Sequence, residues 1–402
     1  MHRCSRRRLL KQGLLGASLS VAYPAFLGRL VERAWASEDP SGSNGDFPIL
    51  VVLQLDGGND GLNTIVPVED DEYRRVRPTL GVDAKSTLAL GGGFGLHPNL
   101  RGLASLWERD RLAIVQAVGY PNPNRSHFRS TEIWHSGHFD PLPDTGWLGR
   151  ALEQPGGSDH PTSGIAIADS RPLILDNHSL LGVTLRDPAA FRQPTWSLDP
   201  ESAGDSEKLQ EFLRRVESRA RISAETVQEV LGRGRNSLPY PQTQLGNELS
   251  LVARFIAGRA PTRVYYLTQT GYDTHARQQT KHEELLQELG DGLAAFVDDL
   301  ERNGDLDRVV LFAFSEFGRR VAENGSLGTD HGVAGPCFVV GSRVRSGLHG
   351  TAPSLAPETL LAGDVAPTTD FRSLYGELLD RWLGVPSRDV LGSAFPSLGV
   401  LA

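Results

Sequence analysis

The stretch Phe47-Pro48-Ile49-Leu50-Val51-Val52-Leu53-Gln54-Leu55 decides the fold class of this chain. It is a continuous apolar run, which is typical of a strand buried on both faces, as in a parallel sheet. Four further apolar runs follow it along the chain, at 112–118, 263–268, 308–314 and 337–340. Segments with a helical pattern lie between and after these runs, at 99–109, 245–257, 278–303 and 371–383. This alternation predicts an α/β fold, a three-layer sandwich with a mostly parallel central sheet.

The middle of the chain has a different pattern and is interpreted as an insertion at about 139–242. It holds two shorter strand candidates, 164–168 and 172–175, and a charged helix predicted over 206–233. We expect this insertion to cover one end of the sheet, within a domain that runs over 47–402. The glycine run 91–95 follows no clear strand and lacks a Lys-Ser/Thr pair, so it is predicted to be a loop and not a phosphate-binding loop.

Composition and charge exclude several classes of protein. The chain has 402 residues, of which 39% are hydrophobic and 22% are charged, as expected of an ordered globular protein. Its two cysteines, Cys4 and Cys337, cannot form a disulfide framework, and Cys337 lies in an apolar run that favours a core position. The formal charge is −8, and the first 36 residues contribute +6, so residues 37–402 carry −14. A chain that acidic is not expected to bind nucleic acid.

The first 36 residues have the organisation of an export signal. A basic start with Arg6, Arg7 and Arg8 leads into an apolar stretch at 13–27, and Ala34-Trp35-Ala36 supplies the small-x-small pattern of a cleavage site. The segment resembles a twin-arginine signal peptide, which would make the Tat translocase a partner during export and the protein periplasmic or secreted. Residues 37–46 are then a linker, and no stable membrane span is expected after cleavage. The alternative is an uncleaved N-terminal anchor.

Polar residues that carry chemistry follow the predicted strands. Because ligands bind outside the carboxyl ends of strands in open α/β sheets, these residues are expected to converge on one edge. Carboxylate and imidazole donors in these proportions suit Zn, Mn or Fe, and paired metal ions are typical of sites that cleave phosphoryl-type esters. The strand-end segments are Asp56–Gly61, Asn124–His127, Tyr272–His275, Ser315–Arg319 and Thr329–Gly332.

Each segment also has an interpretation without chemistry. The loop after Asp56 could be an ordinary turn, and Ser126 could be the N-cap of a helix. Asp273 and His275 could form a surface turn, and Glu316 could pair with a following arginine. The coincidence of all five segments at strand ends favours a metal site.

The combined motifs resemble those of the bacterial DUF1501 family, which is grouped with the alkaline phosphatase and sulfatase superfamily. The resemblance runs from about residue 48 to 402. It is carried by the signal-like leader and by the motifs Leu-Asp-Gly-Gly-Asn-Asp-Gly (55–61), Pro-Asn-Pro-Asn-Arg-Ser-His-Phe (121–128), Tyr-Asp-Thr-His (272–275), Ser-Glu-Phe-Gly-Arg (315–319), Thr-Asp-His-Gly (329–332) and Thr-Asp-Phe-Arg (369–372).

The order of site residues in that superfamily can be carried over by position. It gives Asp56, Ser126 as the nucleophile, Asp273 with His275, Glu316, and His331 as the last histidine. Two features depart from the pattern: one residue separates Asp273 from His275 where three are usual, and Glu316-Phe317 stands where Asp-His is expected. Asp330-His331 as the strand-end pair, with His349 last, is the alternative.

The resemblance implies an exported metal-dependent hydrolase of phosphate or sulfate esters, acting on a small-molecule or glycan ester. Two divalent ions, Zn or Mn, would be held by Asp273, His275 and His331 and by Asp56, Glu316 and Ser126. The alternative is a non-catalytic metal-binding or scaffold protein that retains the fold. Substrate-binding candidates from the same motifs are Asn59, Arg125, Arg129, Arg319 and Asp330.

Overall fold

A nine-stranded sheet forms the centre of the computed structural model, which describes residues 47–192 and 207–402. The predicted signal peptide (1–36) and linker (37–46) lie outside the described residues. The order across the sheet is β11-β5-β10-β9-β1-β8-β6-β7, and β12 pairs with β5. The strands of this sheet are β1 (Ile49–Asp56), β5 (Leu112–Gly119), β6 (Gly164–Ala166), β7 (Val183–Thr184), β8 (Val264–Thr270), β9 (Val309–Phe314), β10 (Gly335–Val340), β11 (Gly347–His349) and β12 (Thr369–Asp370).

The strand β1 lies between β8 and β9 and is parallel to both. Its residues alternate between the two faces, so that Val51 and Leu53 enter one core while Leu50 and Val52 enter the other. Within the described sheet β10 is the strand that runs antiparallel to its neighbours β5 and β9. The expectation of a mostly parallel α/β sheet is confirmed.

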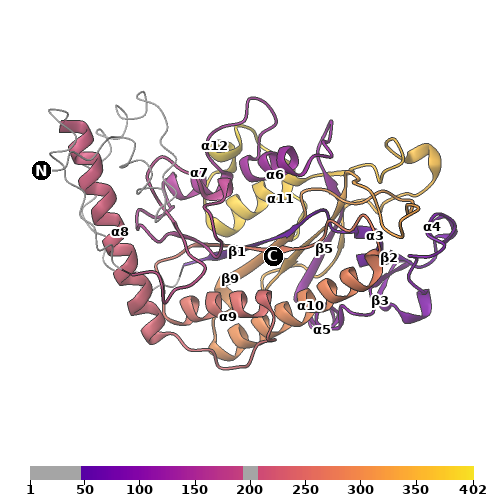
Figure 1. Cartoon of the computed structure of the whole chain (residues 1–402), viewed down its shortest axis with the longest axis horizontal. Helices are drawn as coiled ribbons and strands as arrows, with labels where there is room; N and C mark the ends of the chain where they lie inside the picture. Colours follow the sequence, from indigo (N-terminus) through magenta and orange to yellow (C-terminus); the bar gives the residue numbers. More distant parts are fainter. Residues whose placement is uncertain (1–46, 193–206) are drawn as a thin grey trace, which may run out of the picture.

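Helices cover both faces of the sheet (Figure 1). One face is covered by α5 (Arg101–Glu108), α9 (Gln244–Ala257) and α10 (Gln278–Asn303). The other carries α6 (His127–Ser136), α7 (Trp147–Glu153), α11 (Phe371–Glu377), a π-helical turn at Leu378–Leu383 and α12 (Ser387–Leu391). Sheet and helices therefore form the expected three layers, and Cys337 is buried in the second core.

The predicted insertion contributes to the sheet itself, because β6 and β7 extend it beyond β8. The expected strand at 172–175 is wrong: Leu173–Leu175 is a short 3-10 helix after Pro172, with Ile174 and Leu175 buried against the sheet. Burial rather than pairing explains its apolar residues. The charged helix is α8 (Glu207–Arg233), which lies along one end of the molecule in Figure 1.

A small second sheet lies beyond the carboxyl end of β1. It consists of β2 (Ile65–Pro67), β3 (Leu88–Gly91) and β4 (Phe94–Leu96), flanked by the short helices α3 (Gly61–Thr64) and α4 (Asp71–Val76). The glycine run predicted to be a plain loop is part of the β3–β4 hairpin, where Gly91, Gly92 and Gly93 all have positive φ. Glycine tolerates such φ values, so it suits a tight turn between paired strands.

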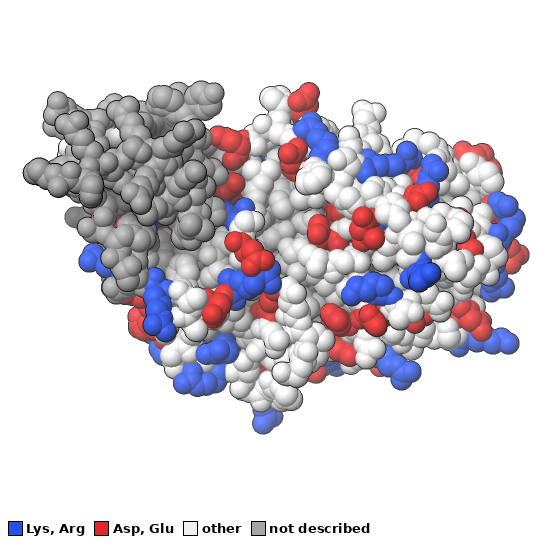
Figure 2. Space-filling model, in the orientation of Figure 1, with Lys and Arg blue, Asp and Glu red and all other residues white. Residues whose placement is uncertain are grey.

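The charges on the surface are mixed. Figure 2 shows acidic and basic side chains interspersed over one face, so the acidic excess of the sequence is not gathered into a single patch there. In the part of the chain that the structure describes, no helix is long and apolar enough to span a membrane.

Candidate metal centre and active site

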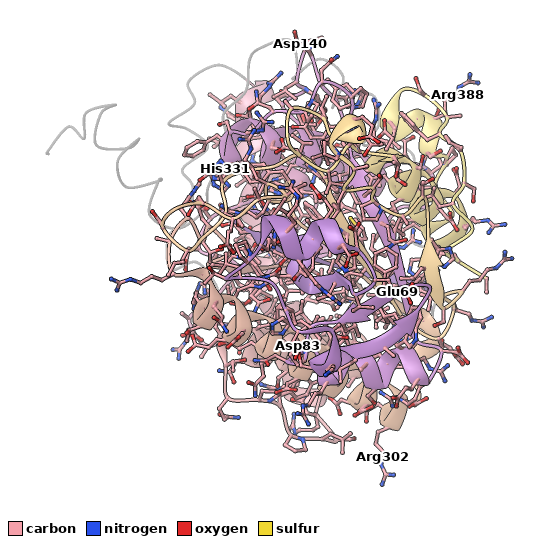
Figure 3. All side chains as sticks on the ribbon, turned by 90° about the vertical axis from the view of Figure 1, so that its right-hand side faces the viewer. Glu69, Asp83, Asp140, Arg302, His331 and Arg388 are labelled. Atoms are coloured by element: carbon pink, nitrogen blue, oxygen red, sulfur yellow. The ribbon has the colours of Figure 1, made fainter. Side chains whose placement is uncertain are left out.

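The carboxyl ends of three neighbouring strands carry the acidic residues of the site. Asp56 is the last residue of β1, Asp273 comes three residues after β8, and Glu316 comes two residues after β9. The parallel register of these strands places Asp56 opposite Thr270 and Gln54 opposite Phe314. The three carboxylates therefore meet at one edge of the sheet. Figure 3 shows this end of the molecule, with His331 labelled.

The carboxylate of Asp273 lies at the centre of a group of imidazoles. Its Oδ1 is 3.1 Å from His275 Nε2, 3.1 Å from His331 Nε2 and 3.5 Å from His127 Nε2. The Nε2 atoms of His275 and His331 are 2.9 Å apart. The ligand atoms of His127, Asp273 and His331 all lie within 4.8 Å of one another. We call His127, Asp273, His275 and His331 the histidine cluster.

The other nitrogen of each imidazole is bonded to an oxygen that can only accept. Nδ1 of His127 donates to Glu316 Oε1 (2.7 Å), Nδ1 of His275 to Asp330 Oδ1 (3.2 Å) and Nδ1 of His331 to the Arg125 carbonyl (2.8 Å). If these imidazoles are neutral and protonated at Nδ1, each Nε2 carries a lone pair that faces the Asp273 carboxylate. Histidine ligands of metal ions typically have this arrangement, because a bonded Nδ1–H fixes the ring with Nε2 free.

The dimensions of the cluster fit a divalent ion. Ligand atoms at about 2.0–2.2 Å around a tetrahedral zinc lie roughly 3.3 Å from one another, which is close to the separations around Asp273 Oδ1. The buried Nε2 of His127 has no hydrogen-bond partner among the described residues. Lone pairs and a carboxylate repel one another unless a cation or a proton lies between them. The donor set therefore fits a resident metal ion.

Charge at Asp273 supports the same conclusion. Burial raises the pKa of this carboxyl, but the hydrogen bond from Arg319, the contact with His331 and the positive charge of Arg319 outweigh burial and lower it to about 2. Asp273 is therefore ionised at any pH at which the protein would work, as a metal ligand must be.

A second acidic pair lies beside the histidine cluster. Glu316 is fully buried, and its Oε1 accepts hydrogen bonds from the Gly57 amide (2.9 Å) and from His127. Burial and the negative charge of Glu316 raise the pKa of Asp56, so the two carboxylates are close enough to interact. The ring of His127 joins this pair to Asp273. The site thus has two adjacent groups of carboxylates, the pair Asp56 and Glu316 on one side and Asp273 on the other, with the imidazole of His127 between them.

Glycine and arginine hold the loops in place beneath the site. Gly57 has a φ of +115°, and a Cβ there would lie 2.5 Å from the backbone nitrogen of Asp273, so the β1 and β8 loops can approach only with glycine at this position. The fully buried Arg319 donates to the carbonyls of Gly58, Thr329 and Tyr272 and to Asp273 Oδ1. It therefore links three of the loops that carry site residues.

Ser126 lies at the start of α6, between two residues that contact the site. The carbonyl of Arg125 accepts from His331, and the His127 ring lies between Glu316 and Asp273. Ser126 is the N-cap residue by position, but its side chain makes no capping hydrogen bond. It is exposed, and the backbone N–H of Ser126 itself donates to Asn124 Oδ1. The alternative of a side-chain cap is therefore not what the structure shows.

Three of the substrate-binding candidates, Arg125, Arg129 and Asp330, make contacts with other residues at or near the surface. Arg125 pairs with the buried Asp364, and Arg129 donates to the Phe139 carbonyl. Asp330 is exposed and accepts from His275.

Two of the substrate-binding candidates are buried. Arg319 lies beneath the site with its donors used by the loops. Asn59 is buried, with Oδ1 accepting from Thr64 and His282. Both side chains are thus engaged within the protein.

The alternative that uses His349 is not supported by its position. His349 lies in β11, opposite Val115 of β5, and its Nε2 donates to the Arg345 carbonyl. His331 instead contacts Asp273 directly.

His127 lies in one of the predicted strand-end segments, but it was not assigned as a metal ligand from the sequence. Its position directly after Ser126, at the first residue of α6, was the available signal, since the first turn of that helix faces the same edge as the strand ends.

Fold and site together define an α/β protein with a carboxylate and imidazole centre at the carboxyl edge of its sheet. A family model described as "Protein of unknown function (DUF1501)" matches residues 114–392. The chain belongs to the DUF1501 family. A comparison with curated proteins found no significant match.

Several solved structures are similar to this chain. A sulfatase from Pseudoalteromonas sp. is 12% identical, with 95% of this chain and 77% of that chain covered and a TM-score of 0.41. The phosphonate monoester hydrolase of Agrobacterium radiobacter is 10% identical, with 87% and 78% covered and a TM-score of 0.39. A protein in the alkaline phosphatase superfamily from Vibrio parahaemolyticus is 11% identical, with 86% and 77% covered and a TM-score of 0.34. At these scores the similarities carry no argument about the chemistry of this chain.

Proposed function

We propose that this protein is an exported, metal-dependent hydrolase of phosphate or sulfate esters. The observation that carries the proposal is the orientation of three imidazole Nε2 atoms toward one ionised carboxylate oxygen, each imidazole being held by a bonded Nδ1. A divalent cation bound between the donors would explain why the three Nε2 atoms converge on this oxygen. An ordinary surface turn would not require this convergence.

The residues suggest two neighbouring ion positions. Asp273, His275, His331 and His127 would hold one ion, and Asp56 and Glu316, with Ser126, would hold the other. Zinc or manganese suits these nitrogen and oxygen donors. Such ions, when bound, supply Lewis acidity that polarises an ester oxygen and lowers the pKa of a hydroxyl.

The remaining chemistry belongs to the chain. Ser126 Oγ would attack the phosphorus or sulfur atom, forming an O–P or O–S bond while the bond to the leaving alkoxide breaks, and the serine proton would pass through solvent to that alkoxide to give the alcohol. Water would then hydrolyse the seryl ester and regenerate the serine. Ser126 suits this role because its hydroxyl is exposed and is not used as a helix cap. The N-terminus of the ten-residue helix α6 adds positive potential for an anionic ester.

The substrate is a small-molecule or glycan ester met outside the cytoplasm. Export by the twin-arginine route fits a metal site, because the chain would fold and load its ions before it crosses the membrane. The segment that supports this route, residues 1–36, is known from the sequence alone.

Metal analysis with an ester panel tests the proposal. The purified mature protein is expected to hold up to two equivalents of zinc or manganese and to hydrolyse a chromogenic phosphate or sulfate ester. His331→Ala should lose one equivalent and all turnover, whereas the matched control His349→Ala should keep both. Metal without turnover would favour a non-catalytic metal-binding protein, and the absence of metal with unchanged behaviour of His331→Ala would contradict the proposed centre.

A further inference from the structure

A β-bulge interrupts the pairing of β5 with β10 near the site. Val118 is paired with Gly335 and Val115 with Cys337, so that two residues, Gln116 and Ala117, stand opposite the single Pro336. Proline has no N–H to donate to the ladder, which favours an irregularity at this position. Bulges of this kind redirect a side chain and are frequent next to functional sites.

The bulge is strained at Ala117. Its φ is +47°, in the left-handed region that residues other than glycine, asparagine and aspartate rarely adopt. Residues held in such conformations cluster at ligand sites, where the surrounding fold maintains them. The strain at Ala117 therefore suggests that the space next to Gln116 and Ala117 has a function.

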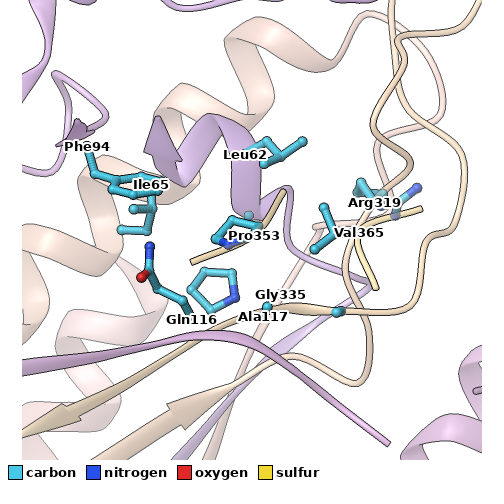
Figure 4. Close-up of a pocket in the computed structure, with 12 residues that line it drawn as sticks. Leu62, Ile65, Phe94, Gln116, Ala117, Arg319, Gly335, Pro353 and Val365 are labelled. Atoms are coloured by element: carbon cyan, nitrogen blue, oxygen red, sulfur yellow. The ribbon is translucent and has the colours of Figure 1, made fainter. Parts of the chain in front are cut away.

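Both residues line a cavity of about 30 Å³ between α3, the start of β10 and the segments that carry Pro353 and Val365 (Figure 4). A cavity needs roughly 10–15 Å³ of this measure to hold one water-sized group, so a group of a few atoms fits here. Most of the lining is apolar and comes from Leu62, Ile65, Phe94, Ala117, Ala334, Pro336, Pro353 and Val365.

Gln116 supplies the polar group of this cavity. The residue is 4% exposed, and its Nε2 has no hydrogen-bond acceptor among the described residues. A buried amide N–H without an acceptor is unfavourable, so its presence needs an explanation. Arg319 also lines the cavity, but its guanidinium is used by loop carbonyls and Asp273. The donor available to an occupant is therefore the Gln116 amide.

We propose that this cavity is a binding site for the end of a neutral ligand that combines a small apolar group with one hydrogen-bond acceptor, such as an acetyl group. The apolar lining would bury the methyl, and the Gln116 Nε2–H would donate to the carbonyl oxygen. A charged group is excluded because the cavity offers no ionised partner that is not already paired. The site is independent of the proposed hydrolysis and does not need a metal ion.

Two probe compounds, acetophenone and α-methylstyrene, test this site. They have nearly the same shape, but only acetophenone, the ketone, has an oxygen that can accept a hydrogen bond. Binding of each to the mature chain is measured by ligand-observed nuclear magnetic resonance titration. Acetophenone is expected to bind about tenfold more tightly, the effect of one hydrogen bond to a buried amide. Gln116→Leu should abolish this preference and leave the thermal midpoint equal or higher, since it removes the unsatisfied donor.

The control variant is Gln279→Leu, an exposed glutamine on α10, which should keep the wild-type preference. Gln116→Met replaces Gln116→Leu if the leucine variant does not fold. Absence of acetophenone binding, which would mean that the cavity holds solvent only, overturns the proposal. Equal binding of the two probes to the wild type, or a preference that survives in the Gln116 variant, overturns it as well.

Discussion

The direction of a single side chain decides whether a residue of this site contacts a ligand or supports the loops. Asp273 and Arg319 both follow strand ends, yet one presents an ionised oxygen to three imidazoles and the other is buried beneath it. Sequence position identifies the edge of the sheet at which a residue lies. It does not give the direction of the side chain, and the burial of Asn59 and Arg319 could therefore not be predicted.

Replacement of Ser126 by alanine separates a nucleophile from a helix cap. Because the Ser126 side chain makes no capping bond, Ser126→Ala should change the free energy of unfolding by less than about 0.5 kcal/mol. Turnover of the ester should be lost while bound metal is retained at the histidine cluster. Full turnover in this variant, measured with metal content and thermal unfolding, would show that Ser126 is not the nucleophile.

Gln278 is the second residue whose contacts support the site from below. It is fully buried, donates to Asp60 and accepts from the hydroxyls of Thr274 (3.0 Å) and Thr329 (2.6 Å). Thr274 lies between two members of the histidine cluster, and Thr329 lies two residues before His331. Gln278 thus connects both loops and acts as a positioning residue.

Gln278→Leu should therefore weaken metal binding as well as the fold. Loss of these hydrogen bonds leaves buried polar groups unpaired, at a cost of about 1–3 kcal/mol in the free energy of unfolding. Metal titration should show a weaker affinity in the folded variant, and the exposed neighbour Gln279→Leu should change neither quantity. Unchanged metal affinity with lowered stability would assign Gln278 a structural role alone.

At the scale of elements, α6 is attached to the sheet by a buried, neutral histidine. His135 Nε2 donates to Gln54 Oε1 of β1 (2.8 Å), and Tyr266 of β8 donates to the same oxygen. Burial lowers the pKa of His135 to about 3, and burial also lowers that of His282 on α10 to about 4. Both imidazoles are therefore neutral in the folded protein.

This predicts a loss of stability in mild acid. The folded pKa values lie below the unfolded value of about 6.5, so the unfolded chain binds more protons as the pH falls below that value. Each histidine then adds a slope of up to about 1.4 kcal/mol per pH unit until its folded pKa is reached. Denaturant unfolding between pH 7 and 5 should show this decline, and His135→Gln should reduce the slope. A slope that His135→Gln leaves unchanged would contradict the assignment.

Most elements could be predicted from apolar pattern and length. The helix over 278–303 has the expected bounds, and the five buried strands lie where expected with ends that differ by one or two residues, because their apolar cores dominate the pattern. The short elements could not be predicted: β11 and β12 have three and two residues and depend on pairing with β5. The apolar run at 172–175 is buried without pairing, which pattern alone cannot distinguish from a strand.

At the scale of the whole molecule, parallel strands are what bring distant segments to one edge. Four connections deliver the site residues Asp56, His127, Asp273, Glu316 and His331, because Glu316 and His331 share the connection between β9 and β10. The convergence of Asp56, Asp273 and Glu316 could be predicted because each lies at or shortly after the carboxyl end of a strand. His127 is itself a helix residue, the first of α6, and only its side-chain contacts show that it belongs to the site.

Export is a prediction about the whole molecule that rests on the sequence of the first 36 residues. Replacement of Arg6 and Arg7 by lysine should retain the precursor in the cytoplasm if the twin-arginine route is used. Immunoblotting of cell fractions measures this, with a single replacement of Arg29 as the control. Normal accumulation of the double variant outside the cytoplasm would contradict this route.

The position of a bound metal tests the central claim most directly. Crystals of the mature protein grown with zinc should show an anomalous scattering peak within about 2.0–2.2 Å of Asp273 Oδ1 and of the Nε2 atoms of His331 and His127 or His275. That result would establish that the lone pairs of the histidine cluster face a cation. A zinc-soaked crystal with no peak there, or with its peaks at other residues while His331 Nε2 donates a proton to Asp273, would contradict the account.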